Sequence, residues 1–147
     1  MKVAEAMSRG AHIVGANDPL KKAAKIMAEE GVGFLPVEED DRLIGMITDR
    51  DIVTRSVAQG KDGSARVRDA MTRDVKYCFE DEEIDDVMEN MADIQVRRLP
   101  VMSRDKRLVG VFSLADGARR YSPDAVGITF SGVVSAGGQH AGHPGRQ

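Results

Sequence analysis

The stretch Val32-Gly33-Phe34-Leu35-Pro36-Val37 decides the fold of this chain, because its pattern returns 64 positions later as Val96-Arg97-Arg98-Leu99-Pro100-Val101. At this shift residues 3–37 share ten identities with residues 67–101, where typical residue frequencies would give roughly two or three. A one-residue insertion in the second polar turn then changes the shift to 65. The pairs that follow it are Arg42 and Arg107, Leu43 and Leu108, Gly45 and Gly110, and Asp51 and Asp116. The chain is therefore a duplicated unit.

Each half has the pattern of one helix followed by a hairpin. Apolar residues recur at i, i+3, i+4 and i+7, which is typical of an amphipathic helix. They are Leu20, Ala23, Ala24 and Met27 in the first half and Ile84, Val87, Met88 and Met91 in the second. Asn17 or Asp18 before Pro19 supplies a cap, and Gly31 can end the helix, so we expect a helix over residues 19–30.

Short apolar runs around polar turns predict the strands. We expect them at Phe34–Glu38, Leu43–Thr48, Leu99–Met102 and Leu108–Ser113, with shorter ones near Ala11–Gly15 and Val75–Phe79. Second helices are expected over about residues 49–59 and 114–121. The fold class is α+β, with two β-α-β-β-α units over residues 1–60 and 61–121 that close over a common core with pseudo-twofold symmetry.

Residues 122–147 differ in composition from the repeats. This stretch is rich in glycine, and of its residues Asp124 and Arg146 alone carry a charge, so we expect a partly disordered tail. Val126–Val134 is apolar enough to add a strand or to pack on a partner chain. His140 and His143 suggest a metal, but beside Gly142 and Pro144 and without a nearby carboxylate or thiol they do not predict a fixed site.

The overall composition excludes several classes of function. The chain has 147 residues, 21 Lys and Arg against 24 Asp and Glu, and a net charge of −3. A broad positive field for nucleic acid or anionic lipid is therefore missing, and no apolar run approaches the ~20 residues of a membrane-spanning helix. With one cysteine and no secretory signal, we expect a cytoplasmic protein that binds neither nucleic acid nor membrane.

Catalytic signatures are absent from the sequence. Gly31-Val32-Gly33 begins like a dinucleotide fingerprint, but it lacks the third glycine and leads into a strand. No Gly-x-Ser-x-Gly motif is present. His12 has no nucleophile or carboxylate at a suggestive spacing, so it is expected at the surface, and Cys78 is expected to pack as a small hydrophobic residue. We expect neither an enzyme nor a metal site.

A hydroxyl and a carboxylate three residues apart recur at the start of each second helix. The two motifs are Thr48 with Asp51 and Ser113 with Asp116. Such a pair resembles a capping box, which is a purely structural role. The same geometry suits a nucleotide, because free helix N–H groups attract phosphate and a carboxylate accepts from adjacent ribose hydroxyls. Gly45 and Gly110, three residues before each hydroxyl, would let a ligand approach the backbone.

These residues together resemble the CBS domain family. The resemblance rests on Val3-x-x-x-Met7, on Gly33-Phe34-Leu35-Pro36-Val37 and on Arg42–Asp51, and it repeats through Val96–Val101 and Gly110–Asp116. Residues 1 to about 121 thus look like a tandem CBS pair, also called a Bateman module, of the stand-alone bacterial kind. The resemblance implies a regulatory module that binds adenosine-containing ligands in clefts between its halves, often forms a flat dimer and catalyses no reaction.

The resemblance also implies roles for particular residues. Thr48 and Ser113 would lie near phosphate, and Asp51 and Asp116 would hold ribose. The residues expected beside adenine are Val32, Val96, Ala11 and Val75. Each cleft would combine the adenine wall of one half with the hydroxyl and carboxylate of the other. In the second motif Leu114-Ala115 replaces Asp49-Arg50, a departure from the nucleotide-binding pattern.

The residues before each proline predict an asymmetry between the two clefts. The first half has Gly33-Phe34 and the second has Arg97-Arg98. Adjacent strand residues face opposite sides, so at most one arginine points into a cleft. The resemblance favours Arg98, which would share its cleft with Thr48 and Asp51; the alternative is a surface arginine paired with an acid such as Asp93.

Two functions of different classes follow. The first is a sensor of AMP, ATP or NAD that requires no cofactor and acts on an unknown protein target. The second is a structural or adaptor homodimer without a ligand, in which both motifs are helix caps. A homodimer is expected in either case, because isolated units of this size leave helical surface exposed. Candidate surface residues are Val53, Val57, Ala58, Ala118 and Tyr121.

Overall fold

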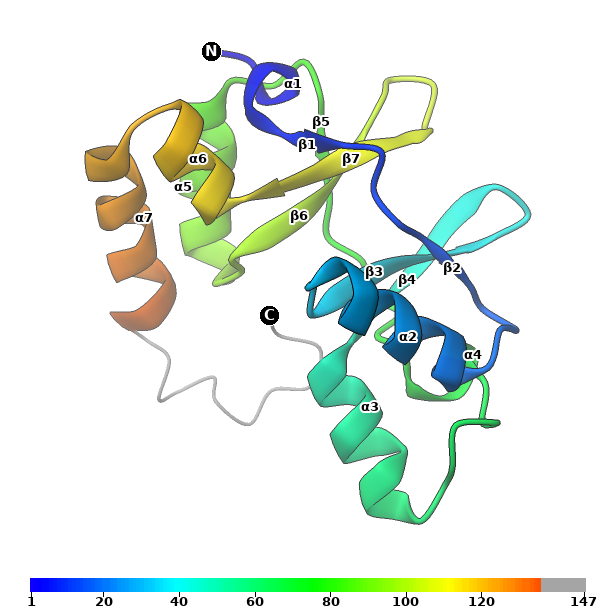
Figure 1. The fold of residues 1–147 in the computed structure, drawn as a ribbon. Coiled ribbons are helices and arrows are strands. Elements are labelled where there is room, and N and C mark those ends of the chain that lie inside the picture. Colours follow the sequence, from blue (N-terminus) through cyan, green and yellow to red (C-terminus); the bar gives the residue numbers. More distant parts are fainter. Residues whose placement is uncertain (136–147) are drawn as a thin grey trace. The chain divides into compact units, whose positions relative to one another are not determined.

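The computed structural model describes residues 1–135, which fall into two compact units. Unit 2 comprises residues 11–75, and unit 1 combines residues 1–10 with the chain from residue 76 onward. Figure 1 shows the elements of both units. Among the described residues, no helix is long and apolar enough to cross a membrane.

Unit 2 follows the predicted β-α-β-β-α order. Its elements are β2 (Val14–Gly15), α2 (Leu20–Glu30), β3 (Phe34–Glu39), β4 (Arg42–Thr48), α3 (Asp49–Arg55), a 3-10 turn η1 (Val57–Gln59) and α4 (Val67–Ala70). In its three-stranded sheet β2 pairs parallel with β3, and β3 pairs antiparallel with β4. The buried face of α2 presents Leu20, Ala23 and Met27 to this sheet, as the apolar spacing predicts, whereas Ala24 of the predicted face is exposed.

Unit 1 repeats this order and adds a helix at its end. Its elements are α1 (Val3–Ala6), β1 (Ser8–Arg9), β5 (Cys78–Phe79), α5 (Ile84–Ile94), β6 (Arg98–Met102), β7 (Leu108–Ser113), α6 (Leu114–Arg120) and α7 (Pro123–Ser135). The sheet order is β1-β7-β6-β5. The mixed helix and sheet content confirms the α+β class.

The short segments before each repeat cross to the other repeat. Residues 1–10 carry α1 and β1, and β1 pairs antiparallel with β7 of the second repeat. Residues 61–75, which precede the second repeat in the same way, carry α4 and pack on the first repeat. There Thr72 forms a β-bridge with Met46 of β4. The sequence division at residue 60 therefore differs from the structural one, since residues 61–75 complete the core of unit 2.

Three local features differ from the sequence expectations. Pro19 itself is the N-cap of α2, while Asp18 accepts a hydrogen bond from the backbone N–H of Gly15 instead of capping the helix. The helix expected over residues 49–59 is interrupted at Ser56, which separates α3 from η1. The strands near residues 11–15 and 75–79 are each two residues long.

The apolar part of the tail forms a helix, not a strand. α7 places Val133 in the core of unit 1, and Val126 lies against Gly117 of α6. A side chain at Gly132 would collide with Ala92 of α5, so glycine permits the close approach of the two helices. Figure 1 shows α7 beside α5 and α6. The predicted disorder toward the end of the chain and the His140/His143 pair lie outside the described residues.

Candidate functional site

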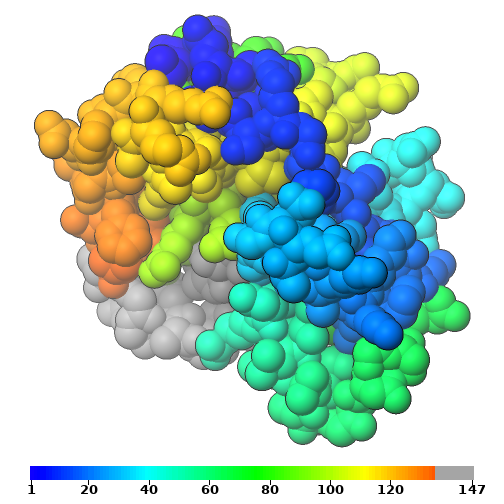
Figure 2. All heavy atoms as spheres, in the orientation of Figure 1, coloured from blue at the N-terminus to red at the C-terminus, as the bar shows by residue number. Residues whose placement is uncertain are grey.

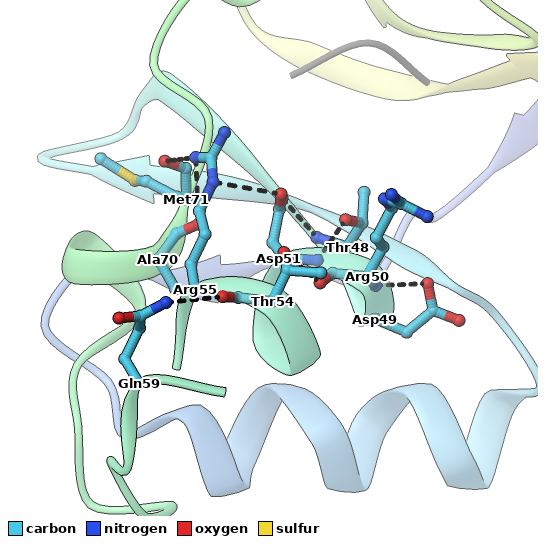
Figure 3. A network of polar contacts seen from close by, with 9 residues as sticks. All are labelled: Thr48, Asp49, Arg50, Asp51, Thr54, Arg55, Gln59, Ala70 and Met71. Carbon is cyan, nitrogen blue, oxygen red and sulfur yellow. Dashed lines mark hydrogen bonds and ion pairs between the residues drawn. The ribbon is translucent and has the colours of Figure 1, made fainter. Parts of the chain in front are cut away.

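Thr48 and Asp51 form a complete capping box at the start of α3 (Figure 3). The N–H of Asp51 donates to Thr48 Oγ1 at 3.0 Å, and the N–H of Thr48 donates to Asp51 Oδ2 at 3.1 Å. Thr48 ends β4, and its extended backbone turns the chain directly into the helix. Both residues are buried, so the Asp51 carboxylate lies at a helix N-terminus with little access to solvent.

The second carboxylate oxygen of Asp51, Oδ1, has a more distant partner than Oδ2. Its charged neighbour is the Nε atom of Arg55, 3.8 Å from Oδ1, a distance too long for a hydrogen bond. Burial raises the pKa of Asp51, and the Thr48 hydrogen bonds and the Arg55 charge offset this shift in part. Capping uses one carboxylate oxygen, so Oδ1 has capacity for another donor.

Arg55 joins α3 to residues 61–75, the segment that precedes the second repeat and packs on the first. Its Nη1 atom donates to the carbonyl of Met71 at 3.1 Å and to that of Ala70 at 3.4 Å (Figure 3). In unit 1 the equivalent Arg120 donates to the carbonyl of Met7. The repeat alignment at a shift of 65 pairs these two arginines, so the sequence contained the signal for this role.

Ser113 and Asp116 form the same capping box at the start of α6. The outer oxygen of this carboxylate, however, is occupied. Asp116 Oδ1 accepts from Ser8 Oγ at 3.2 Å and from Arg119 Nη2 at 2.6 Å. The position of Arg119 in the first motif is Thr54, which cannot form an ion pair. The two motifs therefore share their caps and differ in what surrounds the carboxylate.

Thr72 occupies in unit 2 the place that Ser8 has in unit 1. Ser8 pairs with Val111 of β7, and Thr72 bridges the equivalent Met46 of β4. The Thr72 hydroxyl is buried and has no hydrogen-bond partner within the described residues. Unit 2 thus has an unpaired hydroxyl where unit 1 has a hydroxyl bonded to its aspartate. Comparison of Ser8 and Thr72 in the repeat alignment would have drawn attention to this pair.

Gly45 and Gly110 have a role different from the expected one. A Cβ atom at Gly45 would lie 2.8 Å from the carbonyl oxygen of Thr72, and one at Gly110 would lie 2.4 Å from that of Ser8. The crossing segments fill the space that was expected to admit a ligand. Glycine is required there because two backbones approach closely.

The two arginines before Pro100 have separate surroundings. Arg97 is exposed and lies over the ring of Phe130 in α7, 5.2 Å from its centroid. Arg98 begins β6 and is the register partner of Ser113 in β7. Its predicted place beside Thr48 and Asp51 would require a site formed by both units, and it stays a prediction.

The residues expected near adenine occupy several environments. Val96 is buried and Val32 is exposed, and both follow the C-terminal end of a helix. Ala11 and Val75 are the first and last residues of unit 2, three residues before β2 and β5 respectively. The predicted adenine walls, one in each half, would meet the capping boxes of the other half, and this arrangement stays a prediction.

His12 and Cys78, the other titratable residues considered in the sequence, lie in environments that do not suggest a reactive role. His12 is exposed and lies 3.2 Å from Glu30. Cys78 is buried, and burial raises the pKa of its thiol to about 12, which leaves it protonated and unreactive at neutral pH. Within residues 1–135, no three His, Cys, Asp or Glu side chains are grouped so that they could hold a metal ion.

Comparisons with known proteins place this geometry in a family. Hypoxic response protein 1 of Mycobacterium tuberculosis is 39% identical over 122 residues, which cover 82% of this chain and 85% of that protein. Its structure, solved with two coordinated zinc ions, matches with a TM-score of 0.72 and 38% identity over 81% of this chain and 98% of that one. The CBS domain-containing protein YhcV of Bacillus subtilis is 33% identical over 132 residues, covering 89% of this chain and 94% of that protein.

A structural relative was solved with ligands. The CBS domain pair of protein MJ0100, in complex with 5′-methylthioadenosine and S-adenosyl-L-methionine, matches with a TM-score of 0.71 and 28% identity over 84% of this chain and 98% of that one. The model of the CBS domain family matches residues 3–58 and 67–122. These two matches coincide with the two repeats, and the chain belongs to the CBS domain family as a tandem pair.

Proposed function

We propose that this CBS pair is a regulatory sensor of an adenosine-containing ligand of the AMP, ATP or NAD class, bound at the Thr48–Asp51 motif. The observation that carries the proposal is the difference between the two units. In unit 1 the Ser8 hydroxyl and the Asp116 carboxylate are bonded to each other. In unit 2 the Thr72 hydroxyl is unpaired, and Asp51 Oδ1 has a distant arginine as its neighbour.

Unpaired buried polar groups favour occupation by a ligand. Leaving a buried donor or acceptor unsatisfied costs about 1–3 kcal/mol. Ribose hydroxyls can donate to Asp51 Oδ1, and the N-terminal N–H groups of α3 attract a phosphate. Support for the ligand class comes from MJ0100, whose CBS pair was solved with two adenosine derivatives.

The regulatory part of the proposal follows from the type of module. The alignments with this chain cover 85–94% of the two relatives compared above, so those relatives contain little besides the aligned region. Ligand binding shifts the pair between two states by its differential affinity for them, and a protein target detects the shift. The chain itself catalyses no reaction in this scheme.

A structural adaptor is the second candidate, and one observation favours it. Both hydroxyl and carboxylate pairs form complete capping boxes within their own helices. If capping were their whole purpose, the protein would be a homodimer that binds no nucleotide. The two candidates differ in one measurable property, namely stabilisation by a ligand.

Thermal unfolding with AMP, ADP, ATP, NAD(H) and S-adenosylmethionine tests the proposal. A ligand at 100 times its dissociation constant should raise the free energy of unfolding by about 2.7 kcal/mol. Asp51→Ala should abolish this rise, whereas Asp116→Ala is the matched control at the second motif and should retain it. Unchanged melting with every compound would establish the adaptor function, and an equal loss in both variants would place the ligand elsewhere.

A further inference from the structure

The two repeat motifs differ at the residue three positions after each aspartate. Arg119 follows Asp116 in α6, and at the 65-residue shift its equivalent is Thr54, which follows Asp51 in α3. Residues three positions apart on a helix lie on the same face, so the side chain at this position stands beside the carboxylate. The repeats therefore place an arginine beside one carboxylate and a threonine beside the other.

Arg119 binds Asp116 from this position. Its Nη2 atom donates to Asp116 Oδ1 at 2.6 Å, in an ion pair within one helix. The Asp116 side chain is 3% exposed, whereas that of Arg119 is 62% exposed. Asp116 Oδ2 accepts from the N–H of Ser113 in the capping box, so both oxygens of this carboxylate have a donor.

Thr54 leaves the carboxylate of Asp51 available. Its hydroxyl donates to the carbonyl of Arg50 at 2.8 Å, one turn back along α3. The charged neighbour of Asp51 Oδ1 is Arg55 Nε at 3.8 Å, and the same guanidinium donates through Nη1 to the carbonyl of Met71 (Figure 3). Asp51 thus has no equivalent of the short ion pair that Asp116 forms.

Residues 1–10 supply a second donor to the outer oxygen of Asp116. Ser8 Oγ lies 3.2 Å from Asp116 Oδ1, and Figure 2 shows residues 1–10, in blue, against the yellow-orange surface of α6. A hydroxyl can rotate and can accept as well as donate, so Ser8 can bond to a ligand hydroxyl instead. A guanidinium only donates, and it carries the charge that a buried carboxylate needs beside it. Arg119 is therefore the contact that a ligand would have to displace.

We propose that Arg119 keeps the second motif from binding the adenosine-containing ligand, so that the residue at this one position determines which motif of the pair binds. A hydrogen bond from a charged donor is roughly twice as strong as one between neutral groups. The neutral ribose hydroxyls of a ligand therefore compete poorly with a guanidinium that the same helix holds at the carboxylate. The inference rests on the proposed function for the class of ligand, and its test addresses the second motif separately.

The proposal makes the number of ligands per chain depend on two equivalent residues. AMP is the probe, because its adenosine and phosphate are shared by ATP and NAD. The wild type should bind one AMP per chain, and Arg119→Thr should bind a second. Thr54→Arg should weaken AMP binding at the first motif at least about tenfold, because the new guanidinium can pair with Asp51.

Calorimetry with AMP tests the second motif in a full chain whose first motif is disabled. Asp51→Ala alone should bind no AMP. Asp51→Ala with Arg119→Thr should bind one AMP per chain, and the further change Asp116→Ala should abolish this binding. Asp51→Ala with Arg119→Lys keeps a cation beside Asp116 and should bind at least about tenfold more weakly than the threonine variant.

A matched control separates the role of Arg119 from the loss of a positive charge. Arg107 is an exposed arginine of the same unit, 3.7 Å from Asp105, so Asp51→Ala with Arg107→Thr changes the net charge equally and should bind no AMP. Circular dichroism checks that each variant is folded at the temperature of the titration. Binding of AMP by the Arg107 control would attribute the effect to net charge and overturn the proposal.

The remaining outcomes distinguish this inference from the proposed function. Two AMP molecules per wild-type chain, or none in the variant with Asp51→Ala and Arg119→Thr, would overturn the role of Arg119. If the wild type bound no AMP while that variant bound one, the role of Arg119 would stand and the Thr48–Asp51 motif would be excluded as the binding site. One AMP that is lost with Asp51→Ala and not regained with Arg119→Thr would retain the proposed function alone.

Discussion

Asp51 is a buried carboxylate, although the capping box uses only one of its two oxygens, Oδ2. An amide can accept the same hydrogen bond from the Thr48 N–H through its oxygen, and it is neutral. We therefore expect Asp51→Asn to keep or raise the melting temperature at pH 7, because it removes the desolvation cost. The same change should weaken ligand binding. Asp51→Ala leaves the buried Thr48 N–H without its acceptor and should destabilise the protein by about 1 kcal/mol.

The pH dependence of this difference has a defined sign. Burial raises the pKa of Asp51 in the folded protein above its unfolded value of about 3.9, so the folded state binds the proton more tightly. Its contribution to stability is therefore complete below the unfolded pKa and is lost as pH rises through the folded pKa. Thermal melts should show the advantage of Asp51→Asn in full above that range and none well below pH 4. An advantage that grows with falling pH would contradict the assignment.

Arg98 provides a prediction that separates phosphate from nucleoside. If its guanidinium binds phosphate, Arg98→Ala should weaken AMP or ATP by roughly 1.5–3 kcal/mol, the scale of a charge-assisted hydrogen bond. Binding of adenosine should change little. Calorimetry of both ligands checks this, with Arg97→Ala as control because Arg97 lies over Phe130. Equal losses for nucleotide and nucleoside would remove the phosphate role.

At this scale the sequence predicted the cap partners but not their surroundings. Thr48 with Asp51 and Ser113 with Asp116 lie three residues apart, and helix geometry alone brings such residues together. The Ser8 contact to Asp116 joins residues 108 positions apart and depends on how the chain crosses between repeats. The role of Gly45 was missed for the same reason, since its neighbour Thr72 arrives from a distant segment.

Among the elements, α7 forms a helix in a stretch expected to add a strand or to pack on a partner chain. Gly127 and Gly132 interrupt its apolar run, and apolar residues such as Ile128 and Phe130 are exposed while Val133 is buried. The long helices α2 and α5 and the paired strands were predicted because their apolar spacing is regular. The four-residue helices α1 and α4 are too short to leave a periodic pattern.

Two truncations test the part of α7 in the fold. A chain that ends at residue 136 should keep the wild-type melting temperature, as expected for a dispensable tail end. A chain that ends at residue 122 loses the buried Val133 and the contact of Val126 with Gly117. Burying one valine contributes roughly 1.5–3 kcal/mol, so this truncation should lower the melting temperature by several degrees or more. Equal melting of the two would show that α7 contributes nothing to the core.

For the whole molecule, the crossing of residues 1–10 and 61–75 defines which fragments are complete. A fragment of residues 11–75 contains the whole core of unit 2, including Val67, Ala70 and Met71. A fragment of residues 1–60, which follows the sequence repeat, lacks these three. Circular dichroism and hydrogen exchange should find the first fragment the more ordered. Greater order in residues 1–60 would contradict the exchange of segments.

The positions of residues 1–10 and 61–75 in the fold also determine the order in which the units can fold during synthesis. Every residue of unit 2 has left the ribosome soon after residue 75 is added, so this unit can fold while translation continues at about 5–20 residues per second. Residues 1–10 emerge first, but their partners in residues 80–84, β7 and α6 are all added after unit 2 is complete. Until residues from 78 onward appear, the apolar side chains of Val3, Ala6 and Met7 have no core to enter. The earliest part of the nascent chain is thus buried only after unit 2 is complete, and chaperones that bind short apolar segments have long access to it.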